Sequence, residues 1–139
     1  MKTTNLMIGD WIEAEVQVDD TGKKPVFEKF RKRVTDLVSI GHRVEVSLQD
    51  NVHFGATLSH IPLTPEILEA NNFKKDPEYL DTYWRPDCQK FCFVKENDDW
   101  YFAIRYAGGH ICIAECNYVY KFRHILIDLL DMDTEVVVD

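Results

Sequence analysis

Apolar residues recur at every second position in the first part of the chain, which is the period of half-buried β-strands. Between residues 11 and 18, isoleucine, alanine and valine alternate with Trp11 and polar residues, so that Trp11 is expected on the water-facing side. Similar stretches predict strands over 34–40, 43–48 and 52–58, with turns at 19–25, 41–42 and 49–51. Four short strands at this spacing predict a small antiparallel SH3-like β-barrel or a strongly twisted sheet for residues 1–61.

A short helix with its own start and stop signals is predicted in the middle of the chain, within residues 61–73. Thr64 can accept a hydrogen bond from the free N–H groups of the first turn, and Pro65 suits the first helical position, where an N–H is not needed. Glu66 complements the positive end of the helix dipole, and Asn72 can adopt the left-handed conformation that ends a helix. The surrounding apolar residues are expected to pack this helix against neighbouring sheets.

The last part of the chain combines three predicted strands with an amphipathic helix. Turn residues at 96–99 and 107–109 separate expected strands over 91–95, 100–106 and 110–114. Asn117 is expected to cap a helix whose apolar positions recur at intervals of three and four: Val119, Phe122, Ile125, Leu126, Leu129 and Leu130. This helix is expected to lie across the three-stranded β-meander, with residues 135–138 returning as an edge strand.

These elements together predict an α+β fold. A chain of 139 residues is long enough for one compact core and short for two independent ones, so we expect a single domain of two lobes. The predicted parts are a β lobe over 1–61, the helix and an aromatic segment over 62–87, and a βββα lobe over 88–139.

Acidic residues are concentrated in the second part of the sequence. Residues 1–61 contain eight Lys and Arg against nine Asp and Glu, whereas residues 62–139 contain eight against fifteen, for a total net charge of −8. This acidity disfavours binding to phosphate backbones. Because the amino terminus lacks the apolar run of a secretory signal and no stretch could span a bilayer, we expect a cytoplasmic protein with reduced cysteines and no membrane partner.

A cluster of basic residues surrounds Phe30 in the first lobe: Lys29, Arg31, Lys32 and Arg33. One interpretation is a contact with an anion or with nucleic acid. The other is a solvated edge strand whose charges discourage aggregation, and the acidic neighbours Glu28 and Asp36 favour this second interpretation.

Aromatic residues are concentrated between residues 74 and 87, where the sequence predicts a long loop interrupted by Pro77 and Pro86. Aromatic rings and arginine provide a large contact area at a small loss of conformational entropy. Together with Trp11, the candidate binding residues are Tyr79, Tyr83, Trp84 and Arg85. The alternative is a flap whose rings are buried to keep the loop ordered.

The cysteines form the most suggestive chemical pattern in the sequence: Cys88 with Cys92, Cys112 with Cys116, and His110 nearby. A tetrahedral zinc site requires sulfur atoms within roughly 4 Å of one another. Two cysteines four residues apart in one strand would be about 13 Å apart, so a site would require the chain to fold back at both pairs. Buried structural cysteines are therefore the favoured interpretation, and no metal or other cofactor is expected.

The histidines show no catalytic spacing. His124 and Asp128 lie one helical turn apart and could form an acid–base pair, although a solvent-facing pair of little energetic consequence is the favoured interpretation. His60, beside the central helix, could orient a loop or a ligand. The sequence has no phosphate-binding glycine loop, no G-x-S-x-G elbow and no H-E-x-x-H motif.

Three blocks of the chain together resemble one known family. The blocks are residues 5–12 (N-L-M-I-G-D-W-I), 61–73 (I-P-L-T-P-E-I-L-E-A-N-N-F) and 117–130, with Tyr118-Val119 in the last. They resemble the I-G-N opening, the P-L-T-x-E-x-L central helix and the Y-V closing helix of a family of small uncharacterised proteins, frequent in gut-anaerobe genomes, prophages and mobile elements. The chain departs from that pattern at Asn72, where the family usually has glycine, and at 120–124, where an H-x-L-Q-N pattern is replaced. Any role of that first histidine is therefore absent here or has moved to His124. The resemblance implies a shared fold and a bacterial or phage setting, and it brings no known activity.

These observations predict a non-enzymatic interaction or accessory protein that presents an aromatic surface to a protein partner or to a second copy of itself. A nucleic-acid-binding module that uses the basic first lobe is the alternative. A weaker alternative is a metal-dependent or hydrolytic enzyme built from the cysteines, His110 and His124.

Overall fold

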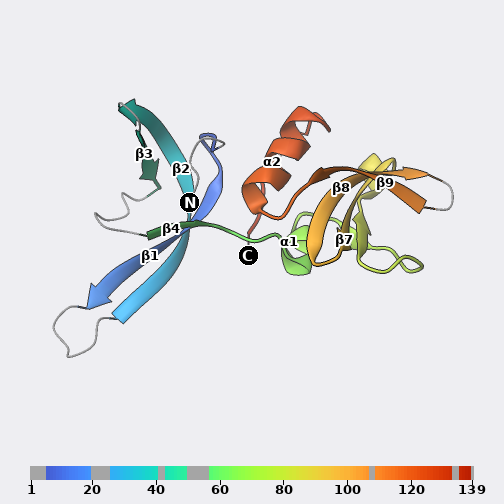
Figure 1. Cartoon of the computed structure of the whole chain (residues 1–139), viewed down its shortest axis with the longest axis horizontal. Helices are drawn as coiled ribbons and strands as arrows, with labels where there is room; N and C mark the ends of the chain where they lie inside the picture. The colour runs from blue at the N-terminus through green and yellow to red at the C-terminus, as the bar shows by residue number, and fades with distance from the viewer. Residues whose placement is uncertain are drawn as a thin grey trace. The chain divides into compact units, whose positions relative to one another are not determined.

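The computed structural model describes residues 6–19, 26–40, 43–49, 57–106, 109–132 and 135–138. The chain divides into two compact units, Met1–Ile61 and Pro62–Asp139, and each is built around one antiparallel sheet (Figure 1). The predicted α+β class is confirmed, with strands far outnumbering helices. Among the described residues, no helix is both long enough and apolar enough to cross a membrane.

The first unit is a four-stranded sheet with the order β3-β2-β1-β4. Its strands are β1 (Trp11–Asp19), β2 (Val26–Ile40), β3 (Arg43–Leu48) and β4 (Thr57–His60). Ile12 and Ala14 are fully buried, whereas Trp11 and Glu13 are half-buried, as the alternation predicts. The described strands form an open sheet that does not close into the predicted SH3-like barrel.

Strand β2 is much longer than the predicted strand over 34–40, because it begins at Val26 and includes the basic cluster. Its first half pairs with β1, where Glu13 lies opposite Arg31 and Trp11 lies opposite Arg33, and its second half pairs with β3. Cross-strand pairing between opposite charges stabilises a strand that lacks apolar alternation. The predicted turns at 19–25 and 41–42 fall largely or wholly outside the described residues, as does most of the predicted strand over 52–58.

Helix α1 (Pro65–Ala70) confirms the predicted start and stop signals. The hydroxyl of Thr64 accepts a hydrogen bond from the Ile67 N–H at 3.3 Å, and Pro65 occupies the first turn. Asn72 follows the helix with a φ of 71°, the left-handed conformation that asparagine tolerates better than most residues.

The second unit contains a five-stranded sheet with the order β5-β6-β7-β8-β9, and helix α2 (Val119–Asp128) follows β9 (Figure 1). The strands are β5 (Lys74–Lys75), β6 (Thr82–Trp84), β7 (Phe91–Glu96), β8 (Asp99–Tyr106) and β9 (Gly109–Glu115), with a 3₁₀ turn η1 (Pro86–Cys88) between β6 and β7. The predicted meander is therefore present as β7 to β9. The predicted long loop over 74–87 instead contributes two further strands.

Aromatic rings form the core between this sheet and the helices. The Phe93 ring lies 5.3 Å from that of Phe73, 5.5 Å from that of Phe102 and 5.0 Å from that of Phe122, measured between centroids. Phe122 and Ile125 are buried, which confirms the predicted register of the closing helix. The predicted apolar stripe is longer than the buried face of the helix, because α2 ends at Asp128 and the following Leu129 is exposed.

Two predictions about the closing region are wrong. Asn117 does not cap α2, because Tyr118 occupies the cap position, and its side chain instead accepts from the Trp100 N–H and donates to Asp99 and Glu115. Residues 135–138 are not assigned as a strand. Val136 and Val138 are nonetheless buried, and Asn71 binds the backbone of Val137 between them.

Candidate functional site

The second sheet buries side chains on both of its faces. Phe93 and Phe102 lie opposite each other on the face that packs against the helices. Cys92, Val94 and Ala103 are also buried, but they lie on the other face, which we call the outer face. Trp84 and Tyr101 of the same sheet are partly buried and pack against them, so that these residues form a small second core.

Asp76 and Arg105 form a partly buried ion pair beside this small core. Arg105 Nη2 lies 3.5 Å from Asp76 Oδ2, and its guanidinium lies over the Trp84 ring, 4.8 Å from the centroid. Asp76 Oδ1 accepts hydrogen bonds from the N–H groups of Glu78 at 2.8 Å and Tyr79 at 3.1 Å. These bonds turn the chain between β5 and β6, which explains why so short a pair of strands forms.

The pKa of Asp76 is held below its ordinary value. The hydrogen bond from the Glu78 N–H lowers it most, and burial opposes that effect; the Tyr79 N–H, the Arg105 charge and the Trp84 indole lower it further. Among the described residues, the Trp84 indole N–H has no hydrogen-bond partner of good geometry.

We expect Asp76→Asn to lower the free energy of unfolding at pH 7. We also expect the free energy of unfolding of this variant to fall less between pH 7 and pH 3 than that of the unsubstituted chain. A carboxyl with a lower pKa in the folded state stabilises the fold above its unfolded pKa, about 3.9, and this contribution is lost as the pH falls through the folded pKa. Urea unfolding at pH 7 and pH 3 measures both effects. Glu78→Gln, in the same turn, is the control, and an equal response of both variants would contradict the assignment to Asp76.

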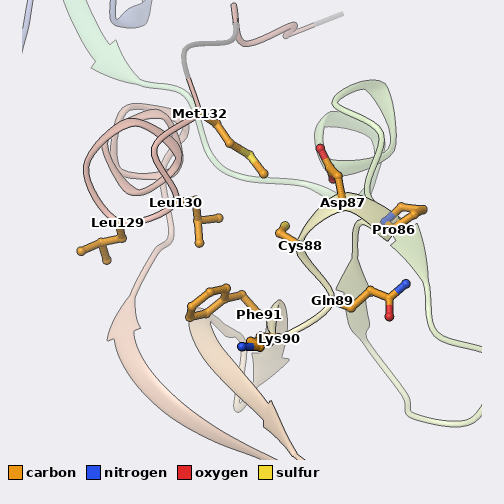
Figure 2. Close-up of a pocket in the computed structure, with 9 residues that line it drawn as sticks. All are labelled: Pro86, Asp87, Cys88, Gln89, Lys90, Phe91, Leu129, Leu130 and Met132. Atoms are coloured by element: carbon orange, nitrogen blue, oxygen red, sulfur yellow. The ribbon is translucent and has the colours of Figure 1, made fainter.

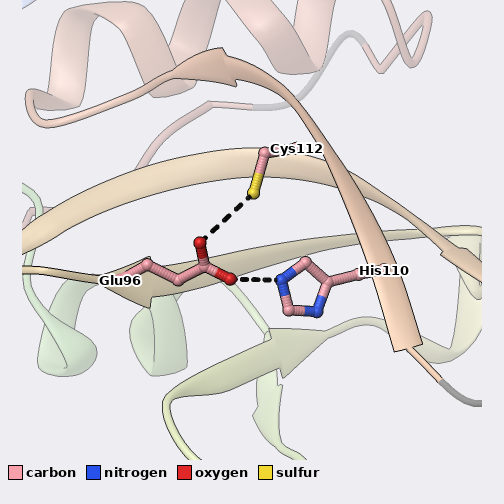
Figure 3. Close-up of side chains that lie close together, drawn as sticks. All are labelled: Glu96, His110 and Cys112. Atoms are coloured by element: carbon pink, nitrogen blue, oxygen red, sulfur yellow. Dashed lines mark hydrogen bonds and ion pairs between the residues drawn. The ribbon is translucent and has the colours of Figure 1, made fainter.

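Glu96, His110 and Cys112 form a second cluster, made by side chains of β7 and β9 (Figure 3). His110 Nε2 lies 2.7 Å from Glu96 Oε1, and Cys112 Sγ lies 3.9 Å from Glu96 Oε2. The three donor atoms all lie within 4.8 Å of one another. Strand β8 lies between the two strands, and Ala103 of β8 is directly opposite Cys112.

The contacts within this cluster do not suit a cysteine that acts as a nucleophile. Glu96 contacts both other residues, so the imidazole is directed at the carboxylate and not at the thiol. Burial, the Glu96 charge and the hydrogen bond to Glu96 raise the pKa of Cys112, which keeps the thiol protonated. An activated cysteine requires the opposite shift and an adjacent base.

The four cysteines are not brought together. Cys88 is half-buried in η1, and Cys116 is fully buried after β9, where burial raises its pKa to about 12. Cys92 and Cys112 share a face, but Ala103 lies between them in the sheet. Burial raises the pKa of Cys92 to about 11. Of the candidate metal ligands, only His110 and Cys112 lie close together. The third residue of their cluster is Glu96, which the sequence analysis did not identify.

The candidate aromatic residues have different environments. Tyr79 is 43% exposed, but Tyr83 is buried, with its ring 5.8 Å from that of Trp100. Trp84 is half-buried beneath Arg105. Arg85 binds both carboxylate oxygens of Asp87, at 2.9 and 2.7 Å, and its guanidinium lies over Phe73. In the first unit, Trp11 is half-buried beneath Arg33.

The basic cluster lies on β2, opposite acidic residues of β1. Glu13 lies opposite Arg31 and Glu15 lies opposite Lys29, and Lys29 Nζ is also 3.8 Å from a Glu13 carboxylate oxygen. Lys32 lies near the Phe30 ring. Carboxylates on the same face lower the positive potential that phosphate binding requires.

A pocket of about 540 Å³ lies between η1, the start of β7 and the residues that follow α2 (Figure 2). Figure 2 shows Phe91, Leu130 and Met132 directed toward its centre, with Cys88 on the opposite wall. The lining is mostly apolar. Phe91 also begins a row of apolar residues across the sheet, because it lies opposite Ile104, which lies opposite Ile111.

The two edges of the second sheet differ in length and chemistry. Strand β5 has only two residues, both lysine, which is a common protection against edge-to-edge pairing. Strand β9 has seven residues without lysine, arginine or proline, and its Ile111 and Ile113 are 59% and 49% exposed. A bulge at Ile113 interrupts its pairing with β8, which leaves Gly109–Cys112 as the regular part.

Comparison with known proteins does not identify a relative: no family model, curated protein or solved structure matches the chain.

Proposed function

We propose that the chain is a non-enzymatic interaction protein that binds an extended segment of a partner protein by adding it as a sixth strand beside β9. The contrast between the β5 edge, which consists of two lysines, and the β9 edge, beside which no other described strand pairs, is the observation that carries the proposal. An exposed edge presents a row of backbone donors and acceptors, and strand addition satisfies them while side chains on alternate positions give specificity.

The hydrogen-bond pattern identifies the β9 residues that face outward. The Arg105 N–H donates to Lys90 on the β7 side, so Ile104 and Tyr106 face β9. Their partners Ile111 and Gly109 therefore face β8. By alternation, the N–H and C=O groups of His110 and Cys112 point away from the sheet and are the groups an added strand would bind.

The two faces beside this edge define the chemistry of the partner. Residues opposite Ile111 would lie next to the apolar row of Phe91, Ile104 and Ile111. Residues opposite His110 and Cys112 would lie on the face that carries Glu96. Because residues 62–139 also carry a net charge of −7, from eight basic and fifteen acidic residues, we expect a segment in which apolar and basic residues alternate.

A fluorescein-labelled peptide of alternating valine and lysine serves as the probe. We expect its fluorescence anisotropy to rise on addition of the full chain, and its affinity to fall with salt because part of the attraction is electrostatic. Ile111→Lys should weaken binding about tenfold or more, since it introduces a like charge and removes an apolar contact. Leu80→Lys, at a residue 79% exposed in the β5–β6 turn, is the charge-matched control.

Equal weakening by the two variants would place binding elsewhere on the acidic unit. Equal affinity for a valine–glutamate peptide would refute the charge complementarity. A stable dimer seen by native mass spectrometry, dissociated by Ile111→Lys, would show that a second copy and not a partner segment occupies the edge.

A further inference from the structure

Three kinds of metal-binding atom converge at one point on the outer face of the second sheet. A carboxylate oxygen of Glu96, Nε2 of His110 and Sγ of Cys112 lie within 4.8 Å of one another (Figure 3). His110 and Cys112 are two residues apart on β9 and therefore share a face, and Glu96 ends β7. In the register of the sheet Glu96 lies opposite Asp99, whereas His110 lies opposite Arg105, so direct cross-strand pairing does not account for their convergence. Strand addition beside β9 does not require the three donor atoms to meet.

We propose that Glu96, His110 and Cys112 bind one Zn²⁺ ion. Zinc is bound by thiolate, imidazole and carboxylate, with bond lengths of about 2.0–2.3 Å. A tetrahedral site with such bonds places its ligand atoms about 3.3–3.8 Å apart, so the cluster needs adjustments of about 1 Å at side chains that are exposed or partly exposed. Three protein ligands leave the fourth position for water or another ligand.

The charges of the cluster also suit a divalent cation. The carboxylate of Glu96 contacts both the imidazole of His110 and the thiol of Cys112. A Zn²⁺ ion would displace the thiol proton to solvent and would offset the charges of both the thiolate and the carboxylate. Nitrogen and sulfur donors select zinc over Mg²⁺ and Ca²⁺, which prefer oxygen.

Spectroscopy with Co²⁺ in place of Zn²⁺ tests the site on the full, metal-depleted chain. One equivalent of Co²⁺ should produce a thiolate-to-metal charge-transfer band and the intense visible bands of a tetrahedral site, and Zn²⁺ should abolish both. Native mass spectrometry should then show one zinc per chain. Cys112→Ser should abolish the charge-transfer band. Glu96→Gln or His110→Asn should weaken Zn²⁺ binding by about 10–100-fold or more, because loss of a residue that only supports a metal ligand already lowers metal affinity by that factor.

Cys88→Ser is the matched control, because Cys88 is a partly accessible thiol outside the cluster. It should retain the spectrum and the affinity of the unsubstituted chain, and circular dichroism confirms that each variant is folded. Absence of a charge-transfer band in the unsubstituted chain would overturn the proposal. So would a band that survives Cys112→Ser or disappears with Cys88→Ser.

Discussion

Replacing Phe93 with alanine is expected to destabilise the second unit by about 3–5 kcal/mol, the largest effect of any substitution considered for this chain. Phe93 is fully buried, and its ring packs against those of Phe73, Phe102 and Phe122. Truncation removes buried apolar area and leaves a cavity between the sheet and both helices. Because the surrounding rings are large, we expect little collapse into that cavity.

Denaturant unfolding followed by tryptophan fluorescence measures this loss. The chain has three tryptophans, and in a Trp11→Phe background the remaining two, Trp84 and Trp100, report on the second unit alone. Leu80→Ala, at an exposed position, should change the free energy of unfolding by less than about 0.5 kcal/mol. A loss below about 1 kcal/mol for Phe93→Ala would show that the aromatic cluster is not the core of this unit.

Replacing Asn71 with alanine is expected to destabilise the same unit by about 2–3 kcal/mol and to release residues 135–138. The Asn71 side chain donates to the carbonyl oxygens of Ile67 and Val137, both at 2.7 Å, and accepts from the Val137 N–H at 2.8 Å. Only 6% of the residue is exposed, so its loss leaves polar groups poorly satisfied. Val136 and Val138 would lose one of the contacts that hold them in the core.

Hydrogen exchange at the Val137 amide measures the release directly. Asn72→Ala is the matched control, because it replaces the neighbouring asparagine at a φ of 71° and should cost about 1 kcal/mol without changing protection at Val137. If Val137 exchanges equally fast in both variants and in the unsubstituted chain, Asn71 does not fix the closing segment.

The sequence predicts those elements whose signals are local. Helix α1 follows from Thr64 and Pro65, and β7 to β9 follow from alternation between turns. The first residues of β2 were missed because their pairing depends on opposite charges across the strands and not on apolar alternation. Strands β5 and β6 are too short to show a period, and they form because Asp76 organises the turn between them.

The candidate sites depend still more on pairing between distant residues. The sequence contained one signal for the Glu96–His110–Cys112 cluster. His110 and Cys112 are two residues apart on a predicted strand, and such residues lie on the same face of a sheet. Glu96 belongs to a polar turn sequence and lies opposite Asp99, whereas His110 and Cys112 lie opposite Arg105 and Ala103, so neither alternation nor strand pairing predicts that the three side chains meet. The difference between the two sheet edges likewise could not be predicted, because the order of the strands is not a local property.

Strand addition beside β9 is tested most directly by methylating the backbone of the valine–lysine peptide. In an antiparallel added strand, lysines opposite His110 and Cys112 would direct their N–H groups toward β9, whereas the valine N–H groups would point away. Methylation of the lysine amides should therefore weaken binding about 10–100-fold, as expected for two or three lost hydrogen bonds, while methylation of the valine amides should leave it nearly unchanged. Equal affinities for the two methylated peptides would contradict strand addition at this edge.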